Sequence, residues 1–164
     1  MKEIKLTQGK TTLVDDTDYD WLVQWKWRAK RNGNTWYAAR SSKRDANNKQ
    51  KTINMHRQIL GITDPKIFGE HKDGDGLNNQ RYNLREATNK ENQHNQRQKQ
   101  GGTSKYKGVY WNKKQEKWKA HIRLGDASPA YLGVFENEED AAIAYNKAAT
   151  KHYGEFARLN IINQ

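Results

Sequence analysis

The sequence has no cysteine, only two prolines and no long apolar run. Without cysteine there is no disulfide framework, and a thiolate-based structural zinc site is disfavoured. No stretch approaches the roughly 18 apolar residues of a membrane-spanning helix, and the N-terminus does not have the pattern of a secretory signal. Apolar residues make up 34% of the 164 residues, which is little for one large core. We therefore expect two small modules in a cytoplasmic protein.

Acidic residues are also few, with 19 Asp and Glu against 30 Lys and Arg and a net charge of +11. Such a surplus favours a polyanionic partner, because cations that contact phosphates release counterions. An anionic membrane surface is the alternative, but no segment combines a basic face with a bulky apolar one. Nucleic acid is the expected partner, and no membrane is expected.

The positive charge is concentrated in residues 93–124, which contain nine basic residues and one acidic residue. Within this region, residues 93–102 have no apolar side chain and end in two glycines, which is typical of a linker. The linker is either a solvated tether or a basic arm that follows the DNA backbone. We predict a first domain over residues 1–95, a basic polar linker over 96–102 and a second domain over 103–160.

In the first domain, alternation over residues 2–6 and 11–14 predicts two short strands, and residues 18–23 a turn of helix. Asn32-Gly33 between two alternating runs predicts a β-hairpin, which makes this part a small sheet. The aromatic residues here are expected to form the core rather than to stack on bases. They are Trp21, Trp25, Trp27, Trp36 and Tyr37.

In the second domain, alternation over residues 118–124 predicts a strand with one apolar face and one cationic face. Lys119, His121 and Arg123 share the cationic face. Residues 106–111 and 130–135 predict flanking strands, and a helix is expected from about 138 to 152, with Asn137 as its N-cap. The predicted fold is α+β, and the second domain is a three-stranded antiparallel sheet with one packed helix.

Residues 68–92 are dense in Asp, Asn, Gly and Arg, a composition that suits a polar site better than a core. Hydrolysis of a phosphodiester needs a base to activate water, a metal to offset charge and a group that fixes both. His71, Glu70 and Asn92 could supply these parts, and their oxygen donors suit Mg²⁺ or Mn²⁺. An ordinary surface Glu-His pair is the alternative. A calcium loop starting at Asp73 is disfavoured, because Leu84 stands where its bidentate Glu belongs.

The spacing of these residues resembles the HNH nuclease family, in its phage and intron-encoded homing type. The resemblance rests on Glu70-His71, Asn83-Leu84-Arg85 and Asn92, with Met55-His56-Arg57 upstream opening a short helix. It implies a ββα-metal motif in which His71 is the general base, Glu70 and Asn92 hold the metal, and Asn83 ties down the loop that orients His71. Glu70 departs from the Asp more common in the family, and its longer side chain would hold the metal differently.

The second domain resembles the ethylene-response-factor (AP-two) DNA-binding domain over about residues 103–160. The matching segments are residues 106–111, 118–123, 131–135 and 139–145. In that family the exposed face of the sheet lies in the major groove, with basic and aromatic side chains on phosphates and base edges. The resemblance carries this role to Lys107, Tyr110, Asn112, His121, Arg123 and Tyr131, and the alternation adds Lys119.

The leading hypothesis is a metal-dependent, site-directed endonuclease of the homing type, from a phage or a bacterium. Its first domain would cut double-stranded DNA and its second would select the site. The alternative is a DNA-binding regulator whose nuclease half is inactive. A third hypothesis, an RNA-binding accessory protein, needs exposed aromatic rings that stack on unpaired bases. The sequence leaves open the target site, nicking against double-strand cleavage, and monomer against homodimer.

Overall fold

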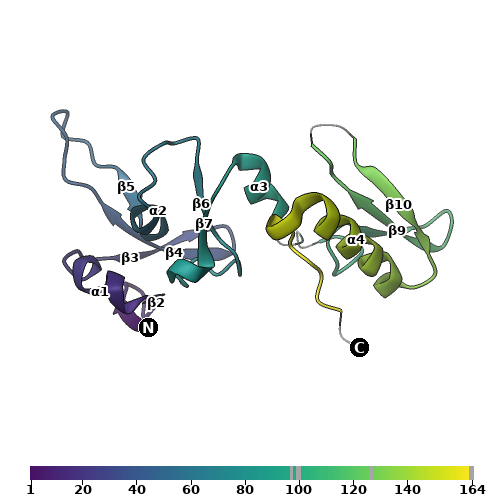
Figure 1. Cartoon of the computed structure of the whole chain (residues 1–164), viewed down its shortest axis with the longest axis horizontal. Helices are drawn as coiled ribbons and strands as arrows, with labels where there is room; N and C mark the ends of the chain where they lie inside the picture. The colour runs from purple at the N-terminus through teal and green to yellow at the C-terminus, as the bar shows by residue number, and fades with distance from the viewer. Residues whose placement is uncertain (97, 99–100, 126–127, 163–164) are drawn as a thin grey trace. The chain divides into compact units, whose positions relative to one another are not determined.

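The computed structural model describes residues 1–96, 98, 101–125 and 128–162. The chain divides into two compact units, Met1–Asn89 and Lys90–Gln164 (Figure 1). Each unit has its own core of buried apolar side chains. The first unit is built from three small antiparallel sheets and the second from one, each with a few helices, which confirms the α+β prediction in this coarse form. The nuclease motif within it is not shown. Residues 97, 99 and 100 of the predicted linker lie outside the described residues, and the three domain bounds stay a prediction.

The first unit contains three small sheets. A two-stranded sheet pairs β1 (Lys2–Lys5) with β2 (Thr11–Val14) and is followed by α1 (Asp16–Leu22). A three-stranded sheet has the order β3 (Arg28–Asn32), β4 (Thr35–Ser41) and β5 (Thr52–Asn54), and it is followed by α2 (Met55–Leu60). A third sheet pairs β6 (Phe68–His71) with β7 (Leu84–Ala87), which the 3₁₀ turn η1 (Arg81–Asn83) precedes.

The predicted hairpin is present as β3 and β4. Asn32 pairs with Thr35, so the connection consists of the two residues Gly33 and Asn34. Gly33 has a φ of +57°, a left-handed conformation that two-residue hairpin turns require and glycine adopts without strain. β3 begins only at Arg28, later than the predicted run.

The predicted aromatic core is only partly right. Trp27 is buried among Leu22, Met55 and other apolar side chains, and its indole N–H donates to the Leu22 carbonyl at 2.8 Å. Trp21 and Trp25 pack against this core from its edge, half-buried. Trp36 and Tyr37 lie outside the cluster. The ring of Trp36 instead contacts the ammonium of Lys10, 4.6 Å from its centroid.

The second unit is one sheet covered by one long helix. The sheet has the strand order β10 (Ala130–Phe135), β9 (Lys117–Ile122) and β8 (Val109–Asn112), all antiparallel. The helix α4 (Glu138–Tyr153) begins where it was predicted, and the 3₁₀ turn η2 (Gly154–Phe156) follows it. Asn137 occupies the N-cap position, but its amide donates to the Asp140 carboxylate at 3.2 Å and caps no backbone group.

Small side chains let α4 pack closely on the sheet. Ala141, Ala142 and Ala149 are fully buried, as the alanine-rich face predicted. The closest approach is at Gly108, where a Cβ atom would lie 2.1 Å from a carbon of the buried Tyr145 ring. Gly108 also has a φ of +77°. Only glycine therefore fits the start of β8 beneath this helix.

The polar stretch of residues 93–102, which contains the predicted linker over 96–102, does not begin as a free tether. Gln93 and His94 are the last residues of helix α3 (Asn89–His94). The His94 ring stacks on that of Tyr153, with centroids 3.7 Å apart and planes at 10°. The composition of the stretch did not predict this contact, because histidine counts as polar although its ring packs well against other rings.

Among the residues the structure describes, no helix has the length and apolarity needed to cross a membrane.

Candidate nucleic-acid interface

The candidate interface is the face of the second unit's sheet that lies opposite α4. In the β8–β9 pair, Val109 stands opposite Ala120, and both are buried against the helix. Tyr110 stands opposite Lys119, one position along each strand. Because successive side chains alternate between the two faces of a sheet, Tyr110 and Lys119 lie on the face turned away from the core.

Three aromatic rings run across this face, one from each strand. The rings of Tyr110 and His121 are stacked, with centroids 5.2 Å apart and planes at 17°. The rings of His121 and Tyr131 are 5.4 Å apart and tilted by 57°. Tyr110 is 42% exposed and Tyr131 is 59% exposed, so the ends of this aromatic row face solvent. Burial, followed by the charge of Lys119, lowers the pKa of His121 and favours its neutral form at pH 7.

Cationic side chains flank the aromatic row. Lys119 and His121 are two residues apart on β9 and share the face, and Arg123 follows the strand with an exposed side chain. Lys117 belongs to the same face, and sequence reasoning missed it, although the same two-residue spacing from Lys119 identifies it. Lys117 contacts Glu136 at 2.7 Å, an exposed pair of little energetic weight.

Two other predicted DNA contacts have different surroundings. The amide of Asn112 donates to Gln115 at 2.7 Å and accepts from the Lys114 N–H at 3.1 Å, so Asn112 shapes the β8–β9 turn. The ammonium of Lys107 donates to the carbonyl of His94 in α3. Burial, followed by the charge of Arg158, lowers the pKa of Lys107 to about 8. Lys107 therefore fills a half-buried position and is no simple surface cation.

In the first unit, Glu70 and His71 end β6, next to β7. Glu70 stands opposite Arg85 in the strand register, and its carboxylate accepts from Nε of Arg85 at 2.7 Å and also from its Nη2. The side chain of Glu70 is 2% exposed and that of Arg85 is 11% exposed. The carboxylate predicted to hold a metal is thus bound to a buried cation within its own sheet.

The predicted base His71 is buried as well. Its Nε2 lies 3.2 Å from the side-chain oxygen of Asn79, and its ring meets that of His56 edge-on, with centroids 4.9 Å apart. Burial lowers the pKa of His71 against the opposing effects of Asn79, Asp73 and Asp75. Burial, followed by the charges of His71 and Arg57, lowers the pKa of His56 to about 3. Both rings are therefore neutral at pH 7.

Asn83 holds the loop between β6 and β7. Its amide nitrogen donates to the Asp73 carboxylate at 3.0 Å and to the Asn78 carbonyl at 2.9 Å, and its oxygen accepts from the Asp73 N–H. Asn79 is fully buried and donates to Thr12 Oγ1 at 2.7 Å. This loop was predicted to be a polar site, and much of its polar content is a buried hydrogen-bond network.

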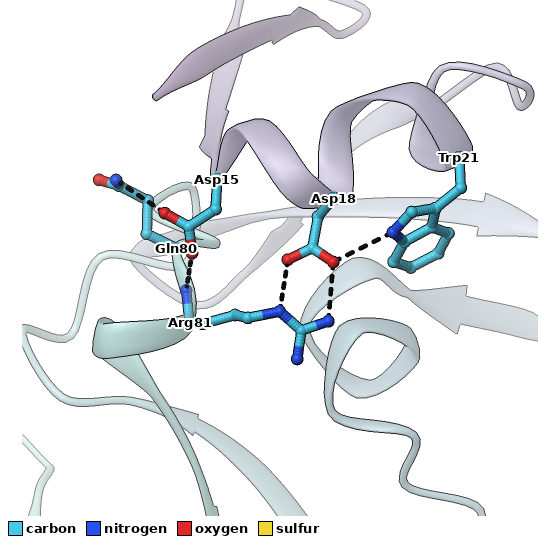
Figure 2. Close-up of polar contacts among 5 residues, drawn as sticks. All are labelled: Asp15, Asp18, Trp21, Gln80 and Arg81. Carbon is cyan, nitrogen blue, oxygen red and sulfur yellow. Dashed lines mark hydrogen bonds and ion pairs between the residues drawn. The ribbon is translucent and has the colours of Figure 1, made fainter.

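Hydrogen bonds join the end of the same loop to α1 and to Asp15, the residue before it (Figure 2). The guanidinium of Arg81 forms two 2.7 Å bonds with the carboxylate of Asp18, which also accepts from the Trp21 indole at 3.0 Å. Asp15 accepts from the Arg81 N–H at 2.7 Å and from the side chain of Gln80 at 3.3 Å. These contacts hold the loop as part of the unit's framework.

The fit of these residues to a divalent ion is poor. Among the described residues, no three His, Asp or Glu side chains converge on a point where a metal could bind. Glu70 already forms an ion pair with Arg85. No catalytic step is derived through such an ion. The roles assigned to Glu70, His71, Asn83 and Asn92, and the binding of Mg²⁺ or Mn²⁺, stay predictions.

Comparison with known proteins gives partial relatives from a plant. The chain is 40% identical over 63 residues to dehydration-responsive element-binding protein 2C of Arabidopsis thaliana. It is 44% identical over 54 residues to the AP2-like ethylene-responsive transcription factors AIL7 and AIL6 of the same plant. These matches cover 38% and 32% of this chain, and less than a fifth of each relative. No protein-family model matches the chain.

These relatives correct the predicted activity. By name they are two transcription factors and an element-binding protein, and none is named as an enzyme. The prediction of an HNH endonuclease is therefore wrong, and the buried Glu70–Arg85 pair gives a physical reason why the spacing misled. The matched length is close to that of the predicted second domain. The matches support an AP2-like DNA-binding domain in this chain.

Proposed function

We propose that this chain is a DNA-binding regulator that contacts double-stranded DNA through the exposed face of the β8–β9–β10 sheet. The observation that carries the proposal is the row of Tyr110, His121 and Tyr131 flanked by Lys119 and Arg123 on that face. Cations position a protein on phosphates, and side chains that reach base edges select sequence. The face offers both kinds of group side by side.

The ring geometry favours a duplex over unpaired bases. A base that stacks needs an open ring face, whereas the faces of Tyr110 and His121 are partly covered by each other. Tyr110 and Tyr131 are the exposed rings of the row, and each carries a phenolic hydroxyl, whereas Nδ1 of His121 is buried. Hydroxyls on such a face suit donors and acceptors in the major groove, which admits a small sheet or ribbon. This geometry supports the duplex over the RNA hypothesis.

The relatives support the same partner. Two of them are named as transcription factors and one as an element-binding protein, and each matches this chain over a segment of domain size. The first unit then acts as a framework and contributes no hydrolysis. We propose a regulator with an inactive nuclease-like half, associated with DNA wherever it occurs in the cell.

The experiment measures binding to duplex DNA by fluorescence anisotropy, with target sequences selected from a random pool. Lys119→Ala should weaken binding to all sequences alike and lower the salt dependence by about 0.9 in the log–log slope, one phosphate contact. Tyr131→Ala should change which sequences are selected. Ile143→Ala is the control, because Ile143 is 52% exposed on α4 and away from the sheet's open face. If both sheet variants bind and select as Ile143→Ala does, the proposed interface is wrong.

A further inference from the structure

The connection between β4 and β5 is a projecting loop of residues 42–51, here named the basic hairpin. Figure 1 shows it extending from the body of the first unit. It carries the cations Lys43, Arg44, Lys49 and Lys51 and a single acid, Asp45, and all five side chains are exposed. Its charge belongs to a unit for which no DNA contact has yet been assigned.

The basic hairpin is folded along its length. At its base, the Ser42 N–H donates to the Lys51 carbonyl at 2.8 Å, and the Ser42 hydroxyl accepts from the Lys51 N–H at 2.9 Å. At its tip, the Asp45 N–H donates to the Lys49 carbonyl at 2.9 Å. A loop ordered before binding loses little conformational entropy when it meets a partner.

The hydrogen bonds of the tip engage its only acid. The Asp45 carboxylate accepts from the N–H groups of Asn47 and Lys49, both at 2.9 Å. The Arg44 guanidinium donates to the carbonyl and side-chain oxygens of Asn48, at 3.0 and 3.1 Å. Asp45 and Arg44 thus shape the tip. Within the described part of the chain, the ammonium groups of Lys43, Lys49 and Lys51 form no ion pair.

Positive charge continues from the hairpin into the unit. The Arg28 guanidinium on β3 donates to the hydroxyls of Ser41 and Thr52, at 2.9 and 3.5 Å, where the hairpin leaves the sheet. A cavity of about 470 Å³, lined in part by Arg40 and Thr52, adjoins this place. The surface there is cationic from the lysines of the hairpin to Arg28 and Arg40.

We infer that the basic hairpin is a second contact with duplex DNA, made by the first unit with the phosphate backbone. This inference rests on the proposed function, since it takes the polyanion that the sheet face binds to be the partner of the hairpin too. Flexible lysines act as point charges toward phosphates and carry no pattern that selects a base. The hairpin therefore adds affinity at every sequence and leaves selection to the sheet.

The test uses the full chain with the triple substitution Lys43→Gln, Lys49→Gln and Lys51→Gln. The control is Lys5→Gln, Lys147→Gln and Lys151→Gln, which removes the same charge from exposed positions elsewhere. The affinity for one duplex is measured across a salt titration, and circular dichroism checks the fold. The hairpin variant should lower the log–log salt slope by about 0.9 per lost contact, about 2.7 for three, with the control near wild type.

The outcomes separate this inference from the proposed function. Equal slopes for the hairpin variant and the control, in a protein that binds duplex DNA and responds to Lys119→Ala, would overturn the second contact alone. A wild-type chain that does not bind duplex DNA would overturn both. A lowered slope that is the same for unrelated duplex sequences would support the contact with the backbone.

Discussion

Glu70→Ala tests whether Glu70 is the partner of Arg85 or a carboxylate reserved for a metal. The pair is buried, with side chains 2% and 11% exposed, so removal of the carboxylate leaves the guanidinium of Arg85 in a poorly solvated position. Loss of one partner of a buried pair typically costs about 3–5 kcal/mol. We expect a loss near that size in the free energy of unfolding. A carboxylate kept for a metal would instead cost little in the metal-free protein.

The assay is urea unfolding followed by tryptophan fluorescence, in metal-free buffer. Glu86→Ala is the matched control, because it removes the same side chain from an exposed position, directly after Arg85 on β7. The coupling between Glu70→Ala and Arg85→Ala, from the double variant, isolates the pair from the other contacts of each residue. A Glu70→Ala protein as stable as Glu86→Ala would refute the structural role given to this carboxylate.

The other predictions follow from the second unit and from the corrected activity. Gly108→Ala should lower the free energy of unfolding by about 2–5 kcal/mol, because the new residue is strained at a positive φ and its Cβ meets the Tyr145 ring. Gly154→Ala is the control measured beside it by thermal unfolding, because a Cβ there has the same backbone strain but nothing within 4 Å. Burial and Lys119 lower the pKa of His121, and DNA phosphates should raise it again, so DNA binding takes up a proton. Affinity should therefore rise as the pH falls through the raised pKa that His121 has in the complex. His121→Asn should flatten that rise, and a pH-independent wild type would contradict it. Supercoiled plasmid should remain uncut with Mg²⁺ present, and nicking that depends on His71 would restore the nuclease hypothesis.

Local patterns predicted much of the fold. β1, β2, β10 and α4 fall close to the predicted residues, because alternation, helical spacing and turn residues act over a few positions. The strand β5 was not predicted, since its three residues follow a polar loop and form a strand only by pairing with β4.

The polar loop of residues 72–83 could not be placed from the sequence. Asn79 and Asn83 are buried, and the partners that make this possible include Thr12, 67 positions from Asn79 in the chain. Such distant contacts leave no local pattern, so the polar composition did not reveal that these side chains are buried. The pairing of Glu70 with Arg85 follows from the β6–β7 register, which the residue spacing alone does not determine.

Part of the interface could be predicted from the sequence, because it depends on a local pattern and not on distant contacts. Alternation along β9 is a local pattern, and it is enough to place Lys119 and His121 on one face of the sheet. The strand register then adds Tyr110 and Tyr131 beside them. The resemblance predicted that Lys107 contacts DNA, but its ammonium donates a hydrogen bond to the carbonyl of His94. That contact depends on where α3 packs, which no spacing in the sequence reveals.

The most direct test of the central claim is selection of duplex DNA by the full chain, followed by affinity measurements with the sheet variants. The account predicts that the wild type enriches a defined sequence and that Lys119→Ala binds it more weakly with the preference kept. It also predicts that Tyr131→Ala alters the preference, while Ile143→Ala changes neither. Enrichment that is the same for all four proteins, or no enrichment by the wild type, would contradict it.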